Sequence, residues 1–372
     1  MIRKIGVLTG GGDAPGLNAA IKALVYELHP YRVEVIAIRY GWEGLLAENI
    51  RDCATLAPEM VRTWDRDGGT RIGSGRYNPF NAKDKAGNSF DNSAEIVESI
   101  EKLKLDALVA MGGEDTQGVS ARLFEEKGIP VVGVPKTIDL DLNGTDYTIG
   151  FWTAVHNCAE TIERSRTPAG SHRWVQVIEV MGRHAGHLAL WSAAVGGAQI
   201  TLIPEYPFEF AQVYEILDGR LKSKRSLYAE SNPGYAIVVV AEGSKPKGGE
   251  LVIQDGRVDA FGHVTLGGIG RMVARRIRDE AGYPCREAVL GHPQRGGPPN
   301  ETDRAMGMFF GANAAKAVVD GDFGKMVSAV GCAPACRITR VPLKDAVGSL
   351  RLVDVERQYD TKYLSIKRVQ SY

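Results

Sequence analysis

Four segments of this 372-residue chain contain residue types and spacings that could do chemistry. The first, Gly10–Asn18, follows the apolar run KIGVLT and precedes a helical pattern that begins at Ala19. Glycines let backbone N–H groups approach an anion closely, and the N-terminus of the following helix adds positive partial charge. The segment is a candidate phosphate site, although an ordinary strand-to-helix turn has the same pattern. It is not a Walker loop, because no Gly-Lys-Ser/Thr sequence closes it.

Two further segments add charged groups. Gly68–Arg76 is a flexible glycine loop in which Arg76 either binds phosphate oxygens through paired hydrogen bonds or is a solvated surface residue. Met111–Thr116 follows the apolar run ALVA and contains Glu114 next to Asp115. Adjacent carboxylates repel each other unless a cation lies beside them, and Mg²⁺ is the natural candidate.

The fourth segment, Pro135–Asp141, combines a cation, a hydroxyl group and two carboxylates. If the segment is extended, Asp139 and Asp141 point to one side, with Lys136 offset. One acid could then ligate a metal ion while the other accepts a proton. The alternative is a capped turn whose acids are solvated.

Short runs rich in valine and isoleucine must position these loops. The runs alternate with longer amphipathic patterns, which is typical of parallel sheets built from strand-helix-strand units. In such folds ligands bind at the carboxyl ends of the strands, where this sequence has its glycines and charges. We therefore expect an α/β fold. The predicted strands are KIGVLT, VEVIAI, ALVAMGG, PVVGVP, VQVIEVMG, YAIVVVAEG and EAVLGH.

The composition argues against several classes of partner and compartment. Lys+Arg and Asp+Glu number 45 each, so no global basic field favours nucleic acid or a membrane surface. The N-terminal sequence does not resemble a signal peptide, and no apolar segment reaches transmembrane length. Five scattered cysteines do not form a secreted disulfide framework, and Cys332 and Cys336 lack a second pair of metal ligands nearby. We expect a cytoplasmic protein without a nucleic-acid or membrane partner.

The ordered set of loops closely resembles the 6-phosphofructokinase family. The similarity rests on TGGGDAPGLNAAI, GGTRIGSGR, GGEDT and PKTIDLDLNGTDYTIGF, and continues through Val180–Gly186, Ala241–Gly243 and Gly291–Gly297. It covers nearly the whole chain. The resemblance implies two Rossmann-like lobes with mainly parallel sheets and with the chemistry in the cleft between them. The expected parts are a phosphoryl-donor-binding lobe at residues 1–140, a sugar-phosphate-binding lobe at 141–310, and a C-terminal segment at 311–372 that completes the lobes.

The resemblance also implies roles for single residues. Asp139 matches the general base that takes the proton from the 1-hydroxyl of fructose 6-phosphate, with Lys136 and Arg183 as further catalytic residues. Glu114 matches a carboxylate associated with Mg²⁺, and Asp141 is a second candidate ligand. The expected donor contacts are Gly11, Gly12, Arg76, Asp115 and Thr137. The expected sugar-phosphate contacts are Thr137, Asp139, Met181, Gly182, Arg183, Glu242, Arg286, His292 and Arg295.

Two residues depart from the family pattern. Leu140 stands between the two acids where the family usually has asparagine. Trp174 stands where the family normally has an arginine that reaches the 6-phosphate bound by a neighbouring subunit. Arg173 could compensate, but on a strand its side chain would point to the opposite face. Because Arg286 and this segment match positions that complete a neighbour's pocket, we expect a homodimer or homotetramer.

Asp115 and Lys136 bear on the choice of phosphoryl donor. ATP-using members of the family have small residues at both positions, which leave room for the α-phosphate and the ribose. A carboxylate at Asp115 would repel the α-phosphate, and Lys136 would neutralise the terminal charge of a donor with only two phosphates. The pattern resembles the pyrophosphate-dependent branch. We therefore expect reversible, Mg²⁺-dependent phosphorylation of fructose 6-phosphate by pyrophosphate.

Three alternatives stay open at this point. The first is an ATP-dependent 6-phosphofructokinase. The second, a non-catalytic sugar-phosphate sensor, requires Asp139 to be dispensable. The third, a nicotinamide-dependent oxidoreductase, could use the first glycine loop, but Tyr31–Glu34 is a poor match to the acidic ribose contact expected about twenty residues on.

Overall fold

The computed structural model describes residues 2–84, 86–222, 234–258, 264–331 and 336–367, which form two compact units. The first unit consists mainly of Met1–Thr153 and Arg295–Leu350. The second consists mainly of Ala154–Arg257, Val264–Gln294 and Arg351–Tyr372. The boundary expected at residue 140 therefore lies at Thr153, and residues 295–310 belong to the first unit rather than to the second. Which ligand each unit binds stays a prediction.

The sheet of the first unit brings the ends of its central strands to one edge. Its strand order is β16-β15-β8-β7-β1-β2-β3, with β4 beside the end of β1. The strands from β15 to β2 are parallel, and β3 and β16 are antiparallel edge strands. These strands are β1 (Lys4–Gly10), β2 (Glu34–Ala37), β3 (Ala54–Leu56), β4 (Ser74–Gly75), β7 (Ala107–Gly112), β8 (Val131–Pro135), β15 (Lys325–Val330) and β16 (Arg337–Pro342).

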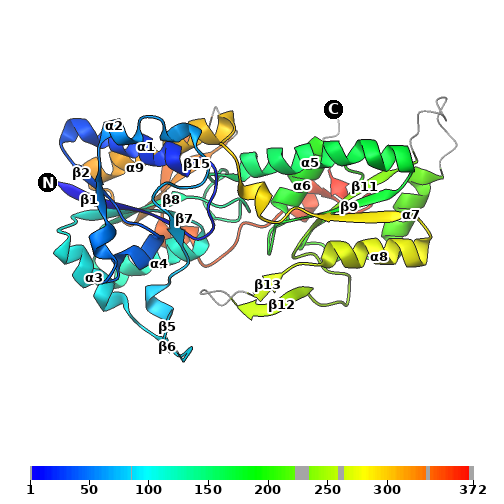
Figure 1. Ribbon diagram of the computed structural model, residues 1–372, viewed down its shortest axis with the longest axis horizontal. Helices are drawn as coiled ribbons and strands as arrows, with labels where there is room; N and C mark the ends of the chain where they lie inside the picture. The colour runs from blue at the N-terminus through cyan, green and yellow to red at the C-terminus, as the bar shows by residue number, and fades with distance from the viewer. Residues whose placement is uncertain (1, 85, 223–233, 259–263, 332–335, 368–372) are drawn as a thin grey trace. The chain divides into compact units, whose positions relative to one another are not determined.

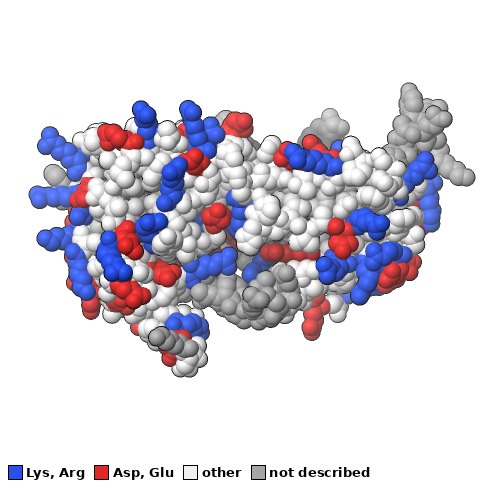
Figure 2. Space-filling view, viewed as in Figure 1, with Lys and Arg blue, Asp and Glu red and all other residues white. Residues whose placement is uncertain are grey.

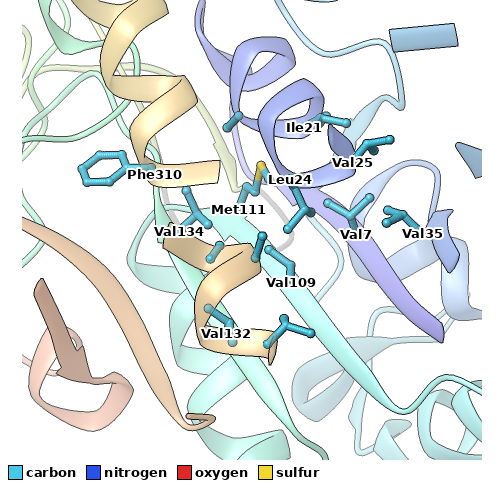
Figure 3. Packing of buried hydrophobic residues seen from close by; sticks show 14 of the residues in the cluster. Val7, Ile21, Leu24, Val25, Val35, Val109, Met111, Val132, Val134 and Phe310 are labelled. Atoms are coloured by element: carbon cyan, nitrogen blue, oxygen red, sulfur yellow. The ribbon is translucent and has the colours of Figure 1, made fainter. Parts of the chain in front are cut away.

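Helices cover both faces of this sheet (Figure 1). Val7 and Val109 point to the face covered by α1 and α9, where they pack with Phe310 (Figure 3). Their neighbours Leu8 and Leu108 belong to the core on the other face, as the two-residue period of a strand requires. The helices of this unit are α1 (Leu17–Leu28), α2 (Pro58–Val61), α3 (Ser93–Lys102), α4 (Glu114–Lys127), α9 (Glu301–Asp320) and α10 (Leu343–Ala346).

At helix α9 the chain returns to the first unit, where α9 packs closely against α1. A Cβ atom on Gly311 would lie 2.1 Å from the carbonyl oxygen of Ala20, and one on Gly307 would lie 2.6 Å from that of Gly16. Only glycine permits this distance between the two helices. The expected second lobe therefore ends earlier than residue 310, since Arg295–Leu350 belongs to the first unit and contributes to its core.

The second unit contains a four-stranded, all-parallel sheet of order β10-β11-β9-β14. Helix α5 lies on one face and α8 on the other (Figure 1). Strand β14 is an edge strand whose Arg286, Glu287 and Val289 side chains are exposed. The elements are α5 (Phe151–His172, which begins in the first unit), β9 (Val175–Val180), α6 (His187–Gly196), β10 (Ile200–Leu202), α7 (Phe210–Leu221), β11 (Ala236–Ala241), α8 (Ile269–Ala281), β14 (Cys285–Val289) and α11 (Val355–Gln358).

Short hairpins and 3₁₀ turns complete the described chain. The hairpins pair β5 (Ala82–Lys83) with β6 (Ser89–Phe90), β12 (Ile253–Val258) with β13 (Val264–Leu266), and β17 (Tyr359–Asp360) with β18 (Ser365–Ile366). The 3₁₀ turns are η1 (His29–Tyr31), η2 (Gly41–Leu45), η3 (Ile50–Asp52), η4 (Trp64–Arg66), η5 (Pro79–Asn81) and η6 (His292–Arg295). All seven predicted strands are present, so the expected α/β fold with mainly parallel sheets is confirmed.

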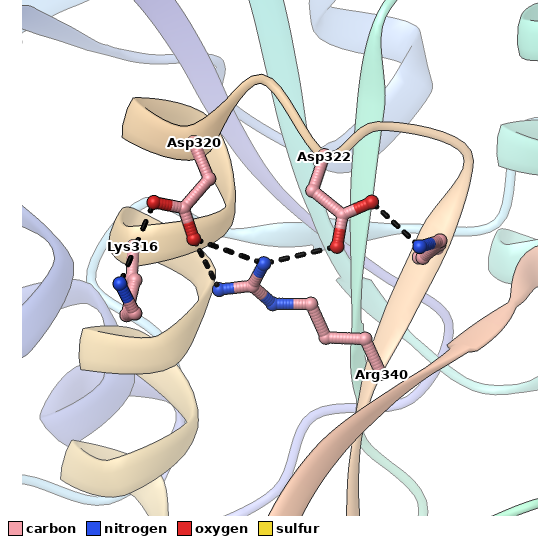
Figure 4. A network of polar contacts seen from close by, with 5 residues as sticks. Lys316, Asp320, Asp322 and Arg340 are labelled. Atoms are coloured by element: carbon pink, nitrogen blue, oxygen red, sulfur yellow. Dashed lines mark hydrogen bonds and ion pairs between the residues drawn. The ribbon is translucent and has the colours of Figure 1, made fainter.

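An ion-pair network joins the edge strand β16 to the end of α9 (Figure 4). Arg340 of β16 contacts Asp322 at 2.9 Å and Asp320 at 3.1 Å, and Lys316 contacts Asp320 at 3.4 Å. Partly exposed pairs of this kind contribute at most about 1 kcal/mol each. Charged side chains on an edge strand also oppose pairing with a strand of another molecule.

Charges of both signs are interspersed on the surface. The face drawn in Figure 2 shows this for the described residues, in keeping with the equal numbers of basic and acidic residues. None of the helices in the described part of the chain combines the length and the apolar composition that a membrane span requires. An anion site in this protein therefore depends on groups that the fold brings together locally.

Candidate active site

The four segments selected from the sequence meet at the carboxyl edge of the first sheet. The N–H of Gly11 donates to the carbonyl oxygen of Gly75 at 2.8 Å, and the Ser74 hydroxyl donates to that of Gly11 at 2.6 Å. These bonds join the first and second loops. The N–H of Lys136 donates to the carbonyl oxygen of Gly112 at 3.1 Å, which joins the fourth loop to the third.

The side chain of Lys136 connects the fourth loop to the first. It is 2% exposed. Its ammonium group donates to the carbonyl oxygen of Gly10 at 2.7 Å and to that of Gly12. The ammonium group also lies 3.3 Å from the position that a Cβ atom on Gly11 would occupy. A side chain at this glycine would therefore crowd the lysine.

The charge of Lys136 is poorly compensated within the protein. Burial is the main cause that lowers the pKa of Lys136, to about 7, and the positive charges of Arg295 and Arg76 act in the same direction. The negative charges of Asp13 and Asp139 oppose them only partly. A bound anion would favour the charged form of the lysine. The arrangement is therefore suited to bind negative charge.

Arg295 lies beside the first glycine loop. Its Nη1 atom donates to the carbonyl oxygen of Asp13 at 3.2 Å. A Cβ atom on Gly12 would lie 2.8 Å from the same nitrogen, so the guanidinium group approaches this closely only because residue 12 is glycine. The family resemblance assigned Arg295 to the sugar phosphate, whereas the structure places it at a loop assigned to the donor. Its role stays a prediction.

Asp139 and Asp141 do not lie on an extended segment, so the condition under which both would point to one side is not met. Leu140 between them has a φ of 56°, in the left-handed region. This conformation costs a leucine about 1–2 kcal/mol, and asparagine adopts it more readily. The side chain of Leu140 is only 6% exposed, and its apolar burial offsets part of that cost. The asparagine usual in the family would therefore suit this backbone without strain.

Negative charge at these two acids is compensated only in part, because Asp139 interacts with Lys136 whereas Asp141 interacts with Asp139 and Glu114. Burial raises the pKa of Asp141 to about 7, and the charges of Asp139 and Glu114 act in the same direction. A hydrogen bond from Thr137 opposes these effects. The Oδ1 atom of Asp139 is buried and has no hydrogen-bond partner among the described residues. A cation placed between these groups would stabilise them.

These acids fit a magnesium ion. Among the described residues, no group of three or more His, Cys, Asp or Glu side chains forms a ready-made metal cage. Mg²⁺ usually binds through one or two protein carboxylates, and water and substrate phosphates complete its octahedral shell. The unpartnered oxygen of Asp139 and the raised pKa of Asp141 are features of such a partly open site.

Glu114 and Asp115 lie in the first turn of α4, after Gly113 at its N-cap. The positive partial charge at a helix N-terminus stabilises acids at this position. Part of the stabilisation that the sequence argument assigned to a cation therefore comes from the helix. The carboxylate of Glu114 also accepts a long hydrogen bond, 3.4 Å, from the N–H of Gly348.

In the second unit, loops that carry predicted sugar-phosphate residues follow the carboxyl ends of β9, β11 and β14. The N–H of Glu242 donates to the carbonyl oxygen of Val180 at 2.9 Å, and the N–H of Gly243 donates to that of Gly182 at 3.1 Å. These bonds join the loop after β11 to the loop after β9. Of the predicted residues, Met181, Gly182 and Arg183 follow β9, Glu242 follows β11, and His292 lies in η6 after β14.

Gln294 supports the same edge of the second sheet and was not among the predicted site residues. Its side chain is 1% exposed. Its Oε1 atom accepts hydrogen bonds from the N–H of Met181 at 3.1 Å and from the Cys158 thiol at 3.4 Å, while Nε2 donates to the carbonyl oxygen of Gly291 at 2.8 Å. One amide thus joins the loop after β9 to the loop after β14. The only sequence signal for this role was the glutamine within GHPQRGG. That signal was not sufficient, because the burial of Gln294 depends on contacts with residues distant in sequence.

Arg286 and Trp174 contact each other in the second unit. The Arg286 guanidinium group lies 5.6 Å from the centroid of the Trp174 ring, which also stacks on His172 at 4.7 Å. Arg173 has a φ of 56° and lies between α5 and β9. The segment is a turn rather than a strand. On a strand the side chains of Arg173 and Trp174 would point to opposite faces, and that argument against a role for Arg173 in place of the family's arginine does not apply to a turn.

Comparison with known proteins identifies similar chains. The family model described as Phosphofructokinase matches residues 4–318. A pyrophosphate–fructose 6-phosphate 1-phosphotransferase of Streptomyces coelicolor is 46% identical over 352 residues, which cover 94% of this chain and 96% of that protein. An ATP-dependent 6-phosphofructokinase of Corynebacterium efficiens is 39% identical over 358 residues, which cover 95% and 96%. The structure of a pyrophosphate-dependent phosphofructokinase from Nitrosospira multiformis has the same fold, with a TM-score of 0.80 at 20% identity over 98% of this chain and 89% of that chain.

Replacing Asp141 by asparagine is expected to stabilise the protein without divalent cations, more at pH 8 than at pH 5. Folding raises the pKa of this carboxyl from 3.8 to about 7, so the folded state holds the proton more tightly than the unfolded state. That stabilisation is complete below pH 3.8 and is lost as the pH rises through about 7. The asparagine variant avoids this loss. Thermal unfolding at pH 8 should show a midpoint roughly 2–4 °C higher for each kcal/mol recovered.

Asp345→Asn is the matched control, because Asp345 is an exposed acid in the same unit. Its midpoint should follow that of the wild type at both pH values. An Asp141→Asn variant with the same midpoint shift at pH 5 and pH 8 would show that the carboxyl is not destabilised by ionisation.

Proposed function

The chain belongs to the phosphofructokinase family and is a phosphotransferase, and from this premise we propose that pyrophosphate is its donor and fructose 6-phosphate its acceptor. The reaction gives fructose 1,6-bisphosphate and phosphate, and it is reversible. The observation that carries the choice of donor is the buried ammonium group of Lys136, held against Gly10 and Gly12 beside the helix that begins with Glu114 and Asp115.

This pairing favours a short donor. The ammonium group of Lys136 cannot swing into solvent, because it is buried and bonded to two carbonyl oxygens. It therefore offers its charge at a fixed place, next to the glycine loop that approaches the donor phosphates. The carboxylate of Asp115 opposes a third phosphate by like-charge repulsion. The greater identity to the pyrophosphate-dependent relative than to the ATP-dependent one supports the same choice.

Asp139 acts as the general base in the proposed mechanism. The oxygen of the sugar 1-hydroxyl attacks the terminal phosphorus of pyrophosphate, and the bond from that phosphorus to the bridging oxygen breaks. The hydroxyl proton passes to the Asp139 carboxylate, whose Oδ1 atom has no other partner among the described residues. Lys136, Arg76 and Thr137 orient the donor and neutralise its charge. Gly11 and Gly12 let the backbone approach the donor closely.

Magnesium would be held by Asp141 and Glu114, with Asp139 beside them. When bound, the ion neutralises charge on the donor phosphates. Its binding requires an ionised Asp141, so a cation at this place lowers the raised pKa of that carboxyl. The acids therefore have separate tasks in the proposal. Asp139 accepts the proton, and Asp141 binds the metal ion.

The second unit supplies most of the sugar-phosphate contacts in this proposal, and Arg295 of the first unit supplies one more. Arg183 stabilises the transferred phosphoryl group, and Arg286 and Arg295 bind the 6-phosphate as bidentate cations. Met181, whose backbone N–H is held by Gln294, and the carboxylate of Glu242 contact the sugar hydroxyls. Gly182 and His292 supply the remaining sugar-phosphate contacts of the second unit.

We further infer that the enzyme is a cytoplasmic homodimer or homotetramer. The exposed edge strand β14 carries Arg286, and Trp174 lies against it. The outer side of β14 pairs with no other described strand. An edge strand with an exposed arginine beside an aromatic ring is suited to contact a second copy, and closed symmetry is the usual arrangement of such copies.

The wild-type enzyme is expected to use magnesium pyrophosphate far better than magnesium ATP, and Asp115→Gly should shift the ratio of kcat/KM values towards ATP. Removing the carboxylate relieves both bulk and repulsion at the α-phosphate. Lys136→Gly is the comparison variant. It removes a cation that supports a loop used by either donor, so it should weaken both donors and change the ratio less. The ratio is measured for the three proteins at fixed free magnesium.

Equal kcat/KM values for the two donors in the wild type would reject pyrophosphate as the preferred donor. An unchanged ratio in Asp115→Gly would instead place donor selection in the pocket that receives adenosine. The forward assay is paired with its reverse, in which the enzyme should form pyrophosphate from fructose 1,6-bisphosphate and phosphate.

Asp139→Asn is expected to lower kcat by about 10²-fold or more, while the KM for fructose 6-phosphate stays close to that of the wild type. The variant keeps the shape of the side chain and removes the base. Asp141→Asn is the matched control, because the same change one residue beyond Leu140 should mainly raise the magnesium concentration needed for half-maximal rate. A large loss of kcat in Asp141→Asn with normal kcat in Asp139→Asn would show that Asp141 is the base and Asp139 the metal ligand.

Sedimentation velocity at assay concentration is expected to show a dimer or tetramer. Arg286→Glu should weaken assembly, since it places a carboxylate at the exposed edge of β14, and should raise the KM for fructose 6-phosphate. Arg278→Glu, an exposed change on α8 in the same unit, is the control. A fully active wild-type monomer would refute the proposed assembly.

A further inference from the structure

We propose that Asp303 is a positioning residue for phosphoryl transfer, because its carboxylate fixes the backbone behind the segment that contains Lys136, Thr137 and Asp139. The inference rests on the function proposed for that segment. Asp303 lies in the first turn of α9 and is completely buried. It contacts no proposed ligand itself, and acts through the segment that precedes α5.

The carboxylate of Asp303 accepts four hydrogen bonds. Its Oδ1 atom accepts from the Tyr147 hydroxyl at 2.5 Å and from the N–H of Gly150 at 2.8 Å. Its Oδ2 atom accepts from the N–H and from the hydroxyl of Thr153, both at 2.6 Å. The Thr153 hydroxyl in turn accepts a bond from the N–H of Asn300 at 3.1 Å. Three residues of the segment 147–153 are thus hydrogen-bonded to Asp303 of α9.

The buried charge is stabilised by dipoles rather than by a cation. Burial raises the pKa of Asp303, and the hydrogen bonds from Thr153, Tyr147 and Gly150 lower it. The carboxylate lies in the first turn of α9 and receives N–H groups at the start of α5, so two helix N-termini favour its negative charge. A buried carboxylate held in this way has a defined position and orientation. It costs desolvation energy that an apolar residue would not.

The fastened segment lies directly beside the fourth loop. The N–H of Ile149 donates to the carbonyl oxygen of Pro135 at 3.0 Å, and Ile149 pairs with Lys136 as an isolated parallel bridge. The hydroxyl of Thr148 donates to the carbonyl oxygen of Thr137 at 2.7 Å. A displacement of this segment would therefore move the backbone of residues 135–137, and with it the ammonium group and the proposed base.

The same segment also supports the first glycine loop. A Cβ atom on Gly150 would lie 2.4 Å from the Cβ of Ala14. One on Gly16 would lie 2.8 Å from Ile149 and 3.0 Å from the carbonyl oxygen of Asp303. No space separates the segment from that loop. Asp303 thereby sets the relative position of two loops that are proposed to bind the donor.

Asp303→Asn tests this inference, because it keeps the size of the side chain but places an NH₂ group among four donors. We expect kcat to fall by about 10-fold to 10²-fold, with the KM for fructose 6-phosphate close to that of the wild type, since the donor and the base are misplaced while the second unit is untouched. Thr153→Val removes one donor and keeps the side-chain shape, so it should have a smaller effect in the same direction. Thr153→Ser retains the hydroxyl and should restore the wild-type kcat.

Hydrogen exchange without substrates provides a readout that does not depend on activity. Amides of residues 136–141 should exchange faster in Asp303→Asn and Thr153→Val than in the wild type and in Thr153→Ser. Ser99→Ala is the control, because it deletes another buried hydroxyl of the first unit, on α3, that has no hydrogen-bond partner among the described residues. Its exchange at residues 136–141 should match that of the wild type.

The proposal is overturned if Asp303→Asn folds with wild-type exchange at residues 136–141, or if exchange rises equally throughout the first unit, as a general loss of stability would cause. It is also overturned if kcat is unchanged. A wild-type protein without pyrophosphate-dependent activity would reject the proposed function, and the exchange measurement would still decide whether Asp303 positions the segment.

Discussion

The bond between the ammonium group of Lys136 and the backbone of the first glycine loop is the contact on which the other charges of the first unit depend. Because Lys136 is buried, its donors must be satisfied by the protein, and the carbonyl oxygens of Gly10 and Gly12 accept two of them. The first and fourth loops therefore cannot move apart without leaving a buried cation unpaired, which is costly. An anion beside the lysine strengthens the same arrangement, so donor binding and loop geometry reinforce each other.

Burial shifts the pKa values of Lys136 and Asp141 in opposite directions. Burial lowers the pKa of the lysine to about 7 and raises that of the acid to about 7, so each group is only partly charged near neutral pH. An anion restores the charge of Lys136, and a divalent cation restores that of Asp141. In the proposed function, a donor that arrives as a magnesium complex would supply both at once. In the proposed function, Lys136 and Asp141 are therefore most fully charged when the complete donor is bound.

Local sequence signals predicted the strands and the loops, but not the contacts between distant segments. Glycines after apolar runs located the first and third loops, glycines alone located the second, and charged residues after an apolar run located the fourth. These patterns depend on neighbouring residues alone. The left-handed turn at Leu140 was missed, since nothing in an apolar side chain indicates a positive φ, and surrounding bonds such as that from Thr148 to Thr137 hold the backbone there. The position of Arg295 beside the first loop likewise depends on the return of α9 to the first unit.

Gln294 and Asp303 both support loops of the site, and residue type alone does not reveal this role. It becomes visible only when the hydrogen-bond partners of each side chain are known. The side chain of Gln294 has two donors facing its oxygen and one carbonyl oxygen facing its nitrogen, so only an amide satisfies all three contacts. The side chain of Asp303 receives four hydrogen bonds, two of them from backbone N–H groups that can only donate, so a carboxylate with two acceptor oxygens suits this place. In isolation both residues resemble ordinary polar positions near a glycine-rich segment. The set of donors and acceptors around each one, which exists only in the folded chain, is what fixes its chemistry.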